Sequence, residues 1–391
     1  MNRSKKGAFH GANLGNWLVL EHWMSPHIFG GTDAEDEVWL NRPESWKDFD
    51  SREELDRRMK QHRDTYVTEE DFAYLSAHGI DHVRIPVPFF IFGDRPPYAG
   101  CIEYLDRAFD WAEAHDMTIL IDLHTVPGSQ NGYDNGGITG VCKWCKDPQA
   151  VAFTYTVLER LAQRYADRKG LFGIEVLNEP INFLTYMTAP STGKSRDREE
   201  AKGSGPVPTS FLKTFYKEAY RRIRKYLPVD KAVVFHDGFR MTAWKDFFVK
   251  SGMENVYLDV HIYIFAMENI AHIHKPWLYR AYIAADRLRL KMVQRYTPVI
   301  VGEWCLCAAY AFDTPKAGLT DAQWQEERRR RYNEIAEIEL SVWEETAGWY
   351  YWNYQLRKDL SDMPDQRWKD PWDLRRCIEE RWLPDLRGGR A

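Results

Sequence analysis

The chain has 391 residues, of which 28% are charged and 44% are hydrophobic, a balance that is ordinary for a soluble globular protein. Its net charge of -5 and pI of about 6.2 give no indication of the strongly basic surface that nucleic acids or anionic membranes attract. No run of about 18 apolar residues occurs, so we expect no membrane span. We also expect no nucleic-acid partner.

Short apolar runs typical of β-strands alternate along the chain with helix-type segments. Eight strands are predicted, at Ala8–Leu14, His82–Val87, Thr118–Leu123, Phe172–Leu177, Ala232–His236, Val256–His261, Pro298–Gly302 and Gly348–Trp352. The helices expected between them are Glu103–His115, Pro148–Lys169, Ser210–Tyr226, Trp277–Gln294 and Ala322–Glu339, and a capping box at Thr68-Glu-Glu-Asp71 indicates one more. This alternation indicates parallel βαβ units.

Eight such units favour a single α/β domain, a (β/α)8 TIM barrel that spans residues 1–391. The rival architecture is a doubly wound sheet, which usually carries a Gly-rich phosphate turn after its first strand. No such turn is present here.

Three long segments follow predicted strands: His22–Tyr66, Tyr186–Thr209 and Trp304–Gln323. In a TIM barrel such segments lie on the C-terminal face, where active sites are built. Long loops in compact domains are usually functional or disordered. We expect residues 186–209, which are rich in Gly, Ser, Pro and charge, to form a mobile lid or a disordered loop.

The N-terminus and the cysteines bear on the compartment. A mildly apolar stretch follows three basic residues near the start, but Asn13 and Asn16 interrupt it. We therefore expect a cytoplasmic protein, with secretion as the alternative. The six cysteines form no framework of a small secreted domain, and reduced thiols are expected. A zinc site or a disulfide that joins Cys142/Cys145 with Cys305/Cys307 is the alternative.

Two glutamates stand at the ends of predicted strands. Glu179 lies in Ile174-Glu-Val-Leu-Asn-Glu-Pro180 and Glu303 in Ile300-Val-Gly-Glu-Trp304. Carboxylates at such ends point into one pocket. Glycoside cleavage uses two carboxyl groups, one that protonates the leaving oxygen and one that attacks the anomeric carbon or activates water. A lone glutamate there would usually be solvated or paired with a base, but two in polar-aromatic motifs favour this chemistry.

These motifs resemble glycoside hydrolase family five, in clan A. Asn178-Glu179-Pro180 is similar to its acid/base motif and Gly-Glu303-Trp to its nucleophile motif. The stretches Asn13–Glu21, Val83–Pro86, Asp122–Asn135 and Gly348–Trp352 are similar to the exo-β-1,3-glucanase branch. The resemblance runs from about Gly11 to Trp352. It implies a retaining β-glycosidase with Glu179 as acid/base, Glu303 as nucleophile and no cofactor or metal.

The resemblance also implies substrate contacts at ten further positions: Glu21, Arg84, His124, Tyr133, Asp134, Asn135, Asn178, His261, Tyr263 and Trp352. Arg84 would hold the nucleophile ionised, because an opposite charge favours the carboxylate. Asn178 would contact the sugar 2-hydroxyl, and Trp352 would form the floor under the sugar.

Some positions depart from the branch. His124-Thr-Val-Pro-Gly128 replaces the usual His-Gly-Ala-Pro-Gly, and Tyr133 stands where phenylalanine is typical. These changes bear on specificity beyond the first glucose. The function expected is an exo-acting β-glucosidase or exo-β-1,3-glucanase with a carbohydrate or glycoside as substrate. The alternatives are a β-glucosidase on a lipid, sterol or disaccharide glycoside, an endo-β-1,4-glucanase, and a non-catalytic carbohydrate-binding barrel.

Overall fold

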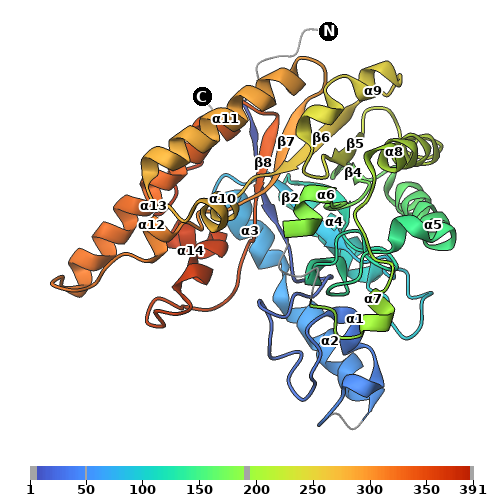
Figure 1. Cartoon of the computed structure of the whole chain (residues 1–391), viewed down its shortest axis with the longest axis horizontal. Coiled ribbons are helices and arrows are strands. Elements are labelled where there is room, and N and C mark those ends of the chain that lie inside the picture. Colours follow the sequence, from blue (N-terminus) through green and yellow to red (C-terminus); the bar gives the residue numbers. More distant parts are fainter. Residues whose placement is uncertain (1–6, 49–50, 189–193, 388–391) are drawn as a thin grey trace.

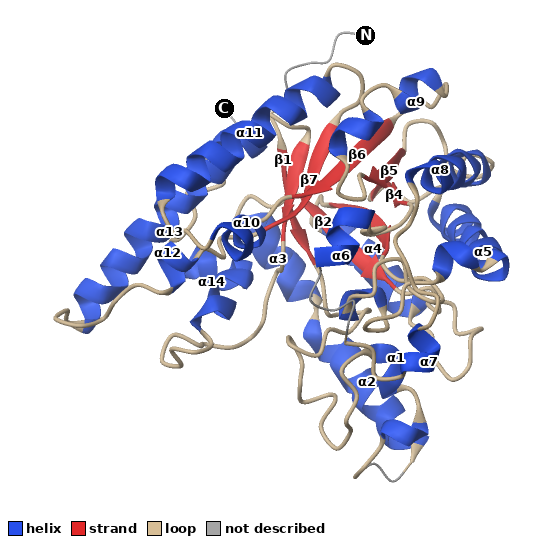
Figure 2. Ribbon diagram, viewed as in Figure 1, coloured by secondary structure: helices blue, strands red, loops and turns tan. Residues whose placement is uncertain are grey.

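Eight parallel strands pair in chain order and close into a barrel, as the computed structural model shows (Figures 1 and 2). The structure describes residues 7–48, 51–188 and 194–387. The strands are β1 (Phe9–Asn13), β2 (His82–Val87), β3 (Thr118–Leu123), β4 (Leu171–Glu175), β5 (Ala232–His236), β6 (Val256–His261), β7 (Val299–Trp304) and β8 (Gly348–Tyr351). The predicted TIM barrel is confirmed, and all eight predicted strands are present with ends that differ by at most two residues.

Alternate residues along each strand serve different surfaces, because side chains alternate across a strand. On β3, Ile119 and Ile121 pack into the large apolar cluster that also holds the helices. Leu120, between them, joins a small cluster with side chains of β5, β7 and β8. Side chains from strands so far apart meet only inside the barrel. The next inward residue of β3 is Asp122, so the barrel interior changes from apolar to polar toward the C-terminal ends of the strands.

Helices cover the outside of the barrel (Figure 2). The longer ones are α3 (Glu69–Ala77), α4 (Ile102–Ala114), α5 (Pro148–Tyr165), α8 (Thr209–Ile223), α11 (Pro276–Gln294) and α13 (Asp321–Trp343). Short helices are α9 (Phe247–Lys250), α10 (Ile264–Ala271) and α14 (Leu374–Glu379). The capping box predicted at the start of α3 is formed, because the Thr68 and Asp71 side chains satisfy each other's backbone N–H groups. No helix within the described residues is long and apolar enough to cross a membrane.

The expectation that residues 22–66 form one long loop is wrong. The segment folds into α1 (Glu37–Leu40) and the longer α2 (Arg52–Tyr66), with an apolar cluster of its own. The helix α2 is rich in charge, yet it buries Leu55, Met59, His62 and Tyr66, which share one face at helical spacing. The many charges of its exposed face conceal this pattern in the sequence.

The segment after β4 contains two short helices, α6 (Phe183–Thr188) and α7 (Arg198–Ala201), and residues 189–193 of the expected lid lie outside the described residues. Figure 1 shows α7 beside α1. Glu200 of α7 forms an ion pair of 2.6 Å with Arg42, and Arg196 forms one of 2.5 Å with Asp33. The described part of this segment is therefore joined to the β1–β2 segment. The third segment contains α12 (Ala309–Phe312).

All six cysteines are free thiols. No group of three cysteine, histidine or acidic ligands that includes a cysteine lies within reach of one ion in the described part of the chain. The arrangement agrees with reduced thiols.

Candidate active site

The two predicted catalytic glutamates are held by different kinds of backbone. Glu303 lies within β7. The sequence suggested that Glu179 lies at the end of a strand, but β4 ends at Glu175 and Glu179 lies in the turn that follows. Glu179 itself has φ 43°, a left-handed conformation that costs free energy for a residue with a Cβ. The turn is held by Arg240, which donates to the Pro180 carbonyl at 2.9 Å, and by Gln130, which donates to the Asn178 carbonyl at 2.8 Å.

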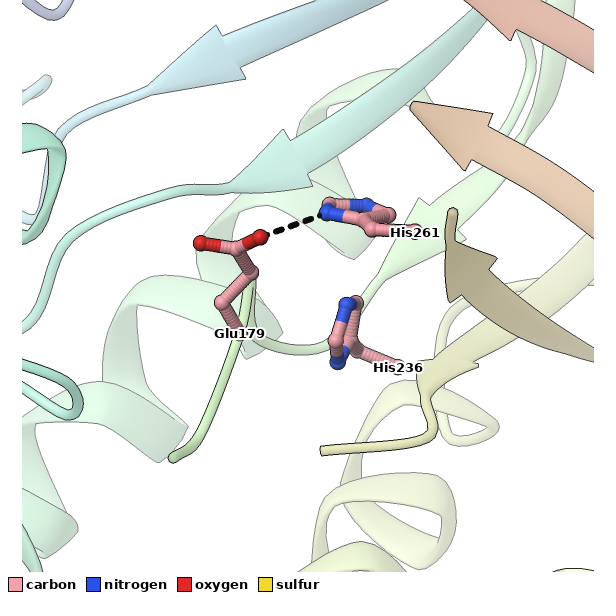
Figure 3. Close-up of side chains that lie close together, drawn as sticks. All are labelled: Glu179, His236 and His261. Atoms are coloured by element: carbon pink, nitrogen blue, oxygen red, sulfur yellow. Dashed lines mark hydrogen bonds and ion pairs between the residues drawn. The ribbon is translucent and has the colours of Figure 1, made fainter. Parts of the chain in front are cut away.

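His261, the last residue of β6, brings the two carboxylates together. Its Nδ1 lies 2.8 Å from Oε1 of Glu179 and 3.3 Å from Oε2 of Glu303. Figure 3 shows the Glu179 carboxylate directed at this ring, with His236 of β5 beside it. Because both oxygens contact this one atom, they are at most about 6 Å apart, which is compatible with the separation of about 5–5.5 Å between the carboxyl groups of retaining enzymes.

Glu303 accepts hydrogen bonds on both carboxylate oxygens. Arg84 Nη1 donates to Oε1 at 3.0 Å, and the Tyr263 hydroxyl donates to Oε2 at 2.8 Å. Asn13 and Asn178 accept two further hydrogen bonds from the Arg84 guanidinium, at 3.0 and 2.9 Å. The guanidinium is thus fixed beneath the pocket and aims a positive charge at Glu303.

Three buried acids surround Arg84 and form what we call the acidic floor: Asp122, Glu175 and Asp259. Their shortest carboxylate–guanidinium distances are 3.1, 2.7 and 3.9 Å, and all three side chains are fully buried. The sequence analysis missed these residues. Each is a single acid inside an apolar strand, and that pattern is the signal that could have found them, because a lone buried acid needs a partner.

Neighbouring charges move the pKa values of the site in opposite directions. Burial raises the pKa of Glu303 and the nearby Glu179 charge adds to it, while His261 and Arg84 act against this rise. Burial also acts to raise the pKa of Glu179, but the hydrogen bond and charge of His261 outweigh it and the pKa is lowered. For His261, burial opposes the charge, but Glu303 and Asp259 raise its pKa well above the ordinary value. These directions favour a positive charge on His261, which contacts both carboxyl groups.

His124, Asn178 and Trp352 form the part of the site next to Arg84. His124 contacts Asp122 at 2.6 Å through Nδ1, and its Nε2 lies 3.4 Å from the Asn178 side-chain nitrogen. The His124 ring stacks on Trp352 with centroids 5.7 Å apart. A Cβ at Gly15 would lie 2.8 Å from the Trp352 ring, so this glycine leaves room for the indole.

The remaining predicted residues lie on the β1 and β3 loops. Glu21 is buried and accepts a hydrogen bond from Trp23 Nε1 at 2.8 Å. Burial and the charge of Asp134 raise the pKa of Glu21 well above its ordinary value. Asn135 donates to Oε2 of Glu179 over 3.4 Å. Burial and the Glu179 charge raise the pKa of Tyr133.

The structure therefore gathers the predicted site residues at one end of the barrel. Two sets of side chains are also close enough for one metal ion within the described residues: Glu179 with His236 and His261, and Glu175 with Asp259 and His261. Both sets need His261. Its two nitrogens already face carboxylates, Nδ1 toward Glu179 and Nε2 toward Asp259 at 3.4 Å. These contacts suit the exchange of protons between His261 and the carboxyl groups better than the binding of a metal ion.

The sequence matches a family of known proteins. Residues 45–355 match the family Cellulase (glycosyl hydrolase family 5). The chain belongs to glycosyl hydrolase family 5. It is an enzyme, a glycoside hydrolase that by its family retains the configuration of the anomeric carbon. Its substrate is therefore a glycoside.

Relatives cover most of the chain. The probable glucan 1,3-beta-glucosidase A of Aspergillus terreus is 30% identical, over 91% of this chain and 86% of its own length. The protein of the same name from Emericella nidulans is 37% identical, over 75% of this chain and 66% of its own. The crystal structure of rutinosidase from Aspergillus niger has a TM-score of 0.70 at 21% identity and covers 97% of this chain and 98% of its own, which supports the fold.

Proposed function

We propose that the protein is an exo-acting β-glucosidase of the glucan 1,3-beta-glucosidase type, which removes terminal β-glucose by double displacement. The observation that carries the proposal is the pair Glu179 and Glu303, joined through His261 within about 6 Å, which suits a retaining reaction. The relatives named glucan 1,3-beta-glucosidase, at 30% and 37% identity, support the choice of sugar and linkage.

In the first step, a carboxylate oxygen of Glu303 attacks the anomeric carbon and the bond to the leaving oxygen breaks. Arg84 and Tyr263 hold the carboxylate in place for this attack. Glu179 gives a proton to the leaving oxygen and becomes a carboxylate, which the hydrogen bond from His261 stabilises. A glucosyl ester on Glu303 remains.

In the second step, Glu179 acts as a base. It removes a proton from a water molecule, whose oxygen attacks the anomeric carbon from the face that the leaving group left. The ester bond to Glu303 breaks and both carboxyl groups return to their starting states. Asn178, whose side-chain oxygen accepts a hydrogen bond of 2.9 Å from Arg84, would bind the sugar 2-hydroxyl, a contact that strengthens in the transition state.

Exo action is supported by Glu21 and by the folded segment that follows it. The Glu21 carboxyl group is buried and close enough to the Asp134 charge for both effects to raise its pKa, so hydrogen-bond donors from a ligand would stabilise its ionised form. Sugar hydroxyls of a terminal glucose are such donors. Leu20, next to Glu21 in the chain, belongs to the apolar cluster that also includes Ile138 and Val141, and this packed segment would close the space beyond the terminal sugar.

Digestion of laminari-oligosaccharides, followed from the earliest time points, tests this proposal. We expect glucose as the only small product. We further expect Glu21→Ala to lower kcat/KM by about 10-fold to 100-fold, as for loss of a charged hydrogen bond of about 1.5–3 kcal/mol. Early release of disaccharides or mixed oligomers, with Glu21→Ala nearly silent, would instead support disaccharide release or endo action.

A further inference from the structure

Asp259 of the acidic floor lies between the two catalytic halves of the site without facing the substrate pocket. Its side chain is fully buried, and Oδ1 accepts a hydrogen bond of 2.7 Å from the backbone N–H of Gly302. Gly302 immediately precedes Glu303 on β7. A Cβ on residue 302 would lie 2.0 Å from Oδ2 of Asp259, so glycine is required for this close approach. Asn13 donates to the Gly302 carbonyl at 2.8 Å, which fixes the next peptide group, the one that joins Gly302 to Glu303.

The second oxygen of Asp259 faces His261. Oδ2 lies 3.4 Å from Nε2 of the ring, within ion-pair distance, and neither atom has a hydrogen-bond partner among the described residues. The other ring nitrogen, Nδ1, contacts Glu179 at 2.8 Å. The imidazole thus stands between the predicted acid/base and Asp259, with a carboxylate oxygen opposite each nitrogen.

The charges around the ring agree with a cation at this position. The titratable and charged groups that face it or reach it electrostatically are Glu175 of β4, Glu179 after β4, Glu303 of β7, Asp259 of β6 itself, Arg84 of β2, and His236 and Asp237 at the end of β5. Acids outnumber bases in this set. His236 accepts a hydrogen bond from the Gly238 N–H on Nδ1, and burial together with the His261 charge lowers its pKa, so it stays neutral.

We propose that Asp259 is a positioning residue that keeps His261 protonated on both nitrogens, so that the imidazole shares one proton with Glu179, while the same carboxylate fixes the strand that carries Glu303. The inference rests on the proposed roles of Glu179 and Glu303. The shared proton moves between His261 Nδ1 and Glu179 Oε1 along their hydrogen bond. With the proton on Nδ1, the pair is an imidazolium and a carboxylate. With the proton on Oε1, the pair is a neutral ring and a carboxylic acid. When Glu179 protonates the leaving oxygen, the pair loses this proton. It regains one from the water molecule that attacks in the second step.

The variant Asp259→Asn separates the two duties of this residue. The amide oxygen can still accept from Gly302 N–H, so the β7 strand stays fixed. The amide nitrogen then faces His261 Nε2, which has to become an acceptor and lose its proton. We expect the alkaline limb of the kcat/KM profile to move to lower pH by at least about one unit, because a buried opposite charge at this distance shifts a titration by about that much. KM at the pH optimum should change by less than about threefold, because Asp259 does not touch the sugar.

Glu175→Gln is the matched control. It removes one negative charge from the same acidic floor, but its hydrogen bond of 2.7 Å goes to Arg84. Arg84 supports Glu303, so this variant should move the acidic limb. It should move the alkaline limb clearly less than Asp259→Asn does, because Glu175 lies near His261 but bonds to Arg84. An equal movement of the alkaline limb in both variants would overturn the proposal, because loss of any buried charge would then suffice. An unmoved alkaline limb in a folded Asp259→Asn protein would overturn it as well.

A measurement on the unsubstituted protein covers the case in which Asp259→Asn does not fold. Nitrogen-15 NMR at pH 7 reports the protonation of each imidazole nitrogen, and His261→Asn identifies the resonances of this ring. We expect both nitrogens of His261 to carry protons. A neutral ring would contradict the proposal and leave the catalytic assignment intact, whereas loss of activity in Glu179 and Glu303 variants tests that assignment separately.

Discussion

The acid/base side and the nucleophile side of this site are built differently. Glu303 sits within a strand and receives fixed donors on both oxygens, from Arg84 and Tyr263. Glu179 sits on a turn with φ 43° and receives one strong contact, from His261, and a longer one of 3.4 Å from Asn135. The difference follows from the chemistry. A nucleophile has to be held at one position, whereas the acid/base has to exchange protons with a leaving group and then with water.

The largest expected effect comes from removing the rigid side. Glu303→Ala should lower kcat by about 10⁴-fold or more, on activated and natural substrates alike, because the covalent step is lost. Initial rates on an aryl β-glucoside and on a laminari-oligosaccharide measure this. Retention of more than a hundredth of the activity on both would remove Glu303 from the nucleophile's role.

Removing Glu179, the acid/base, should lower kcat less than removing Glu303, and the loss should depend on the substrate. Glu179→Ala should lower kcat by about 10²-fold to 10⁴-fold on oligosaccharides, the usual contribution of general acid catalysis. An aryl glucoside with an acidic phenol needs little protonation, so its first step should be nearly normal and show a burst. Equal losses on both substrates would mean that the acid is another residue.

A smaller effect should follow from one donor to the nucleophile. Tyr263→Phe removes the hydroxyl that lies 2.8 Å from Oε2 of Glu303 and leaves Arg84 in place. The expected loss in kcat/KM is about 10-fold to 100-fold, as for one hydrogen bond to a charged group. Thermal unfolding serves as the control, and a pure loss of stability with normal kcat/KM would contradict the assignment.

The pH dependence tests the electrostatics on both sides with the smallest change to the protein. Glu303 has to be ionised to attack, so activity falls as the pH drops through its pKa. Burial raises that pKa, which places the acidic limb above the ordinary range of a glutamate. The alkaline limb belongs to the Glu179–His261 pair, whose proton is lost as the pH rises. A single-limbed profile with no alkaline decline would contradict a shared catalytic proton.

Much of this comparison can be predicted from sequence, but unevenly. The strands follow from short apolar runs, and the barrel confirms them. The two glutamates follow from motifs that resemble family five. The conformation of Glu179 could not be predicted, because a positive φ at a glutamate depends on contacts with Gln130 and Arg240, which lie far away in the chain.

The acidic floor and α2 were missed for related reasons. Asp122, Glu175 and Asp259 are each unremarkable in a single strand, and only closure of the barrel brings them around Arg84. The apolar residues of α2 stand among many charged residues in the sequence. Their packing partners include Ile138 and Val141 of the β3 loop, which lie far away in the chain. Both the acidic floor and the buried face of α2 depend on contacts between residues far apart in the sequence.

Trapping of the covalent intermediate tests the central claim most directly. A 2-deoxy-2-fluoro-β-glucoside with a good leaving group should inactivate the enzyme, because the electronegative fluorine slows the second step more than the first. Mass spectrometry of the digested protein should find one fluoroglucosyl group, on the peptide that contains Glu303. Labelling of the peptide that contains Glu179 would reverse the two roles, and absence of any adduct in an enzyme that turns over the parent glucoside would contradict double displacement.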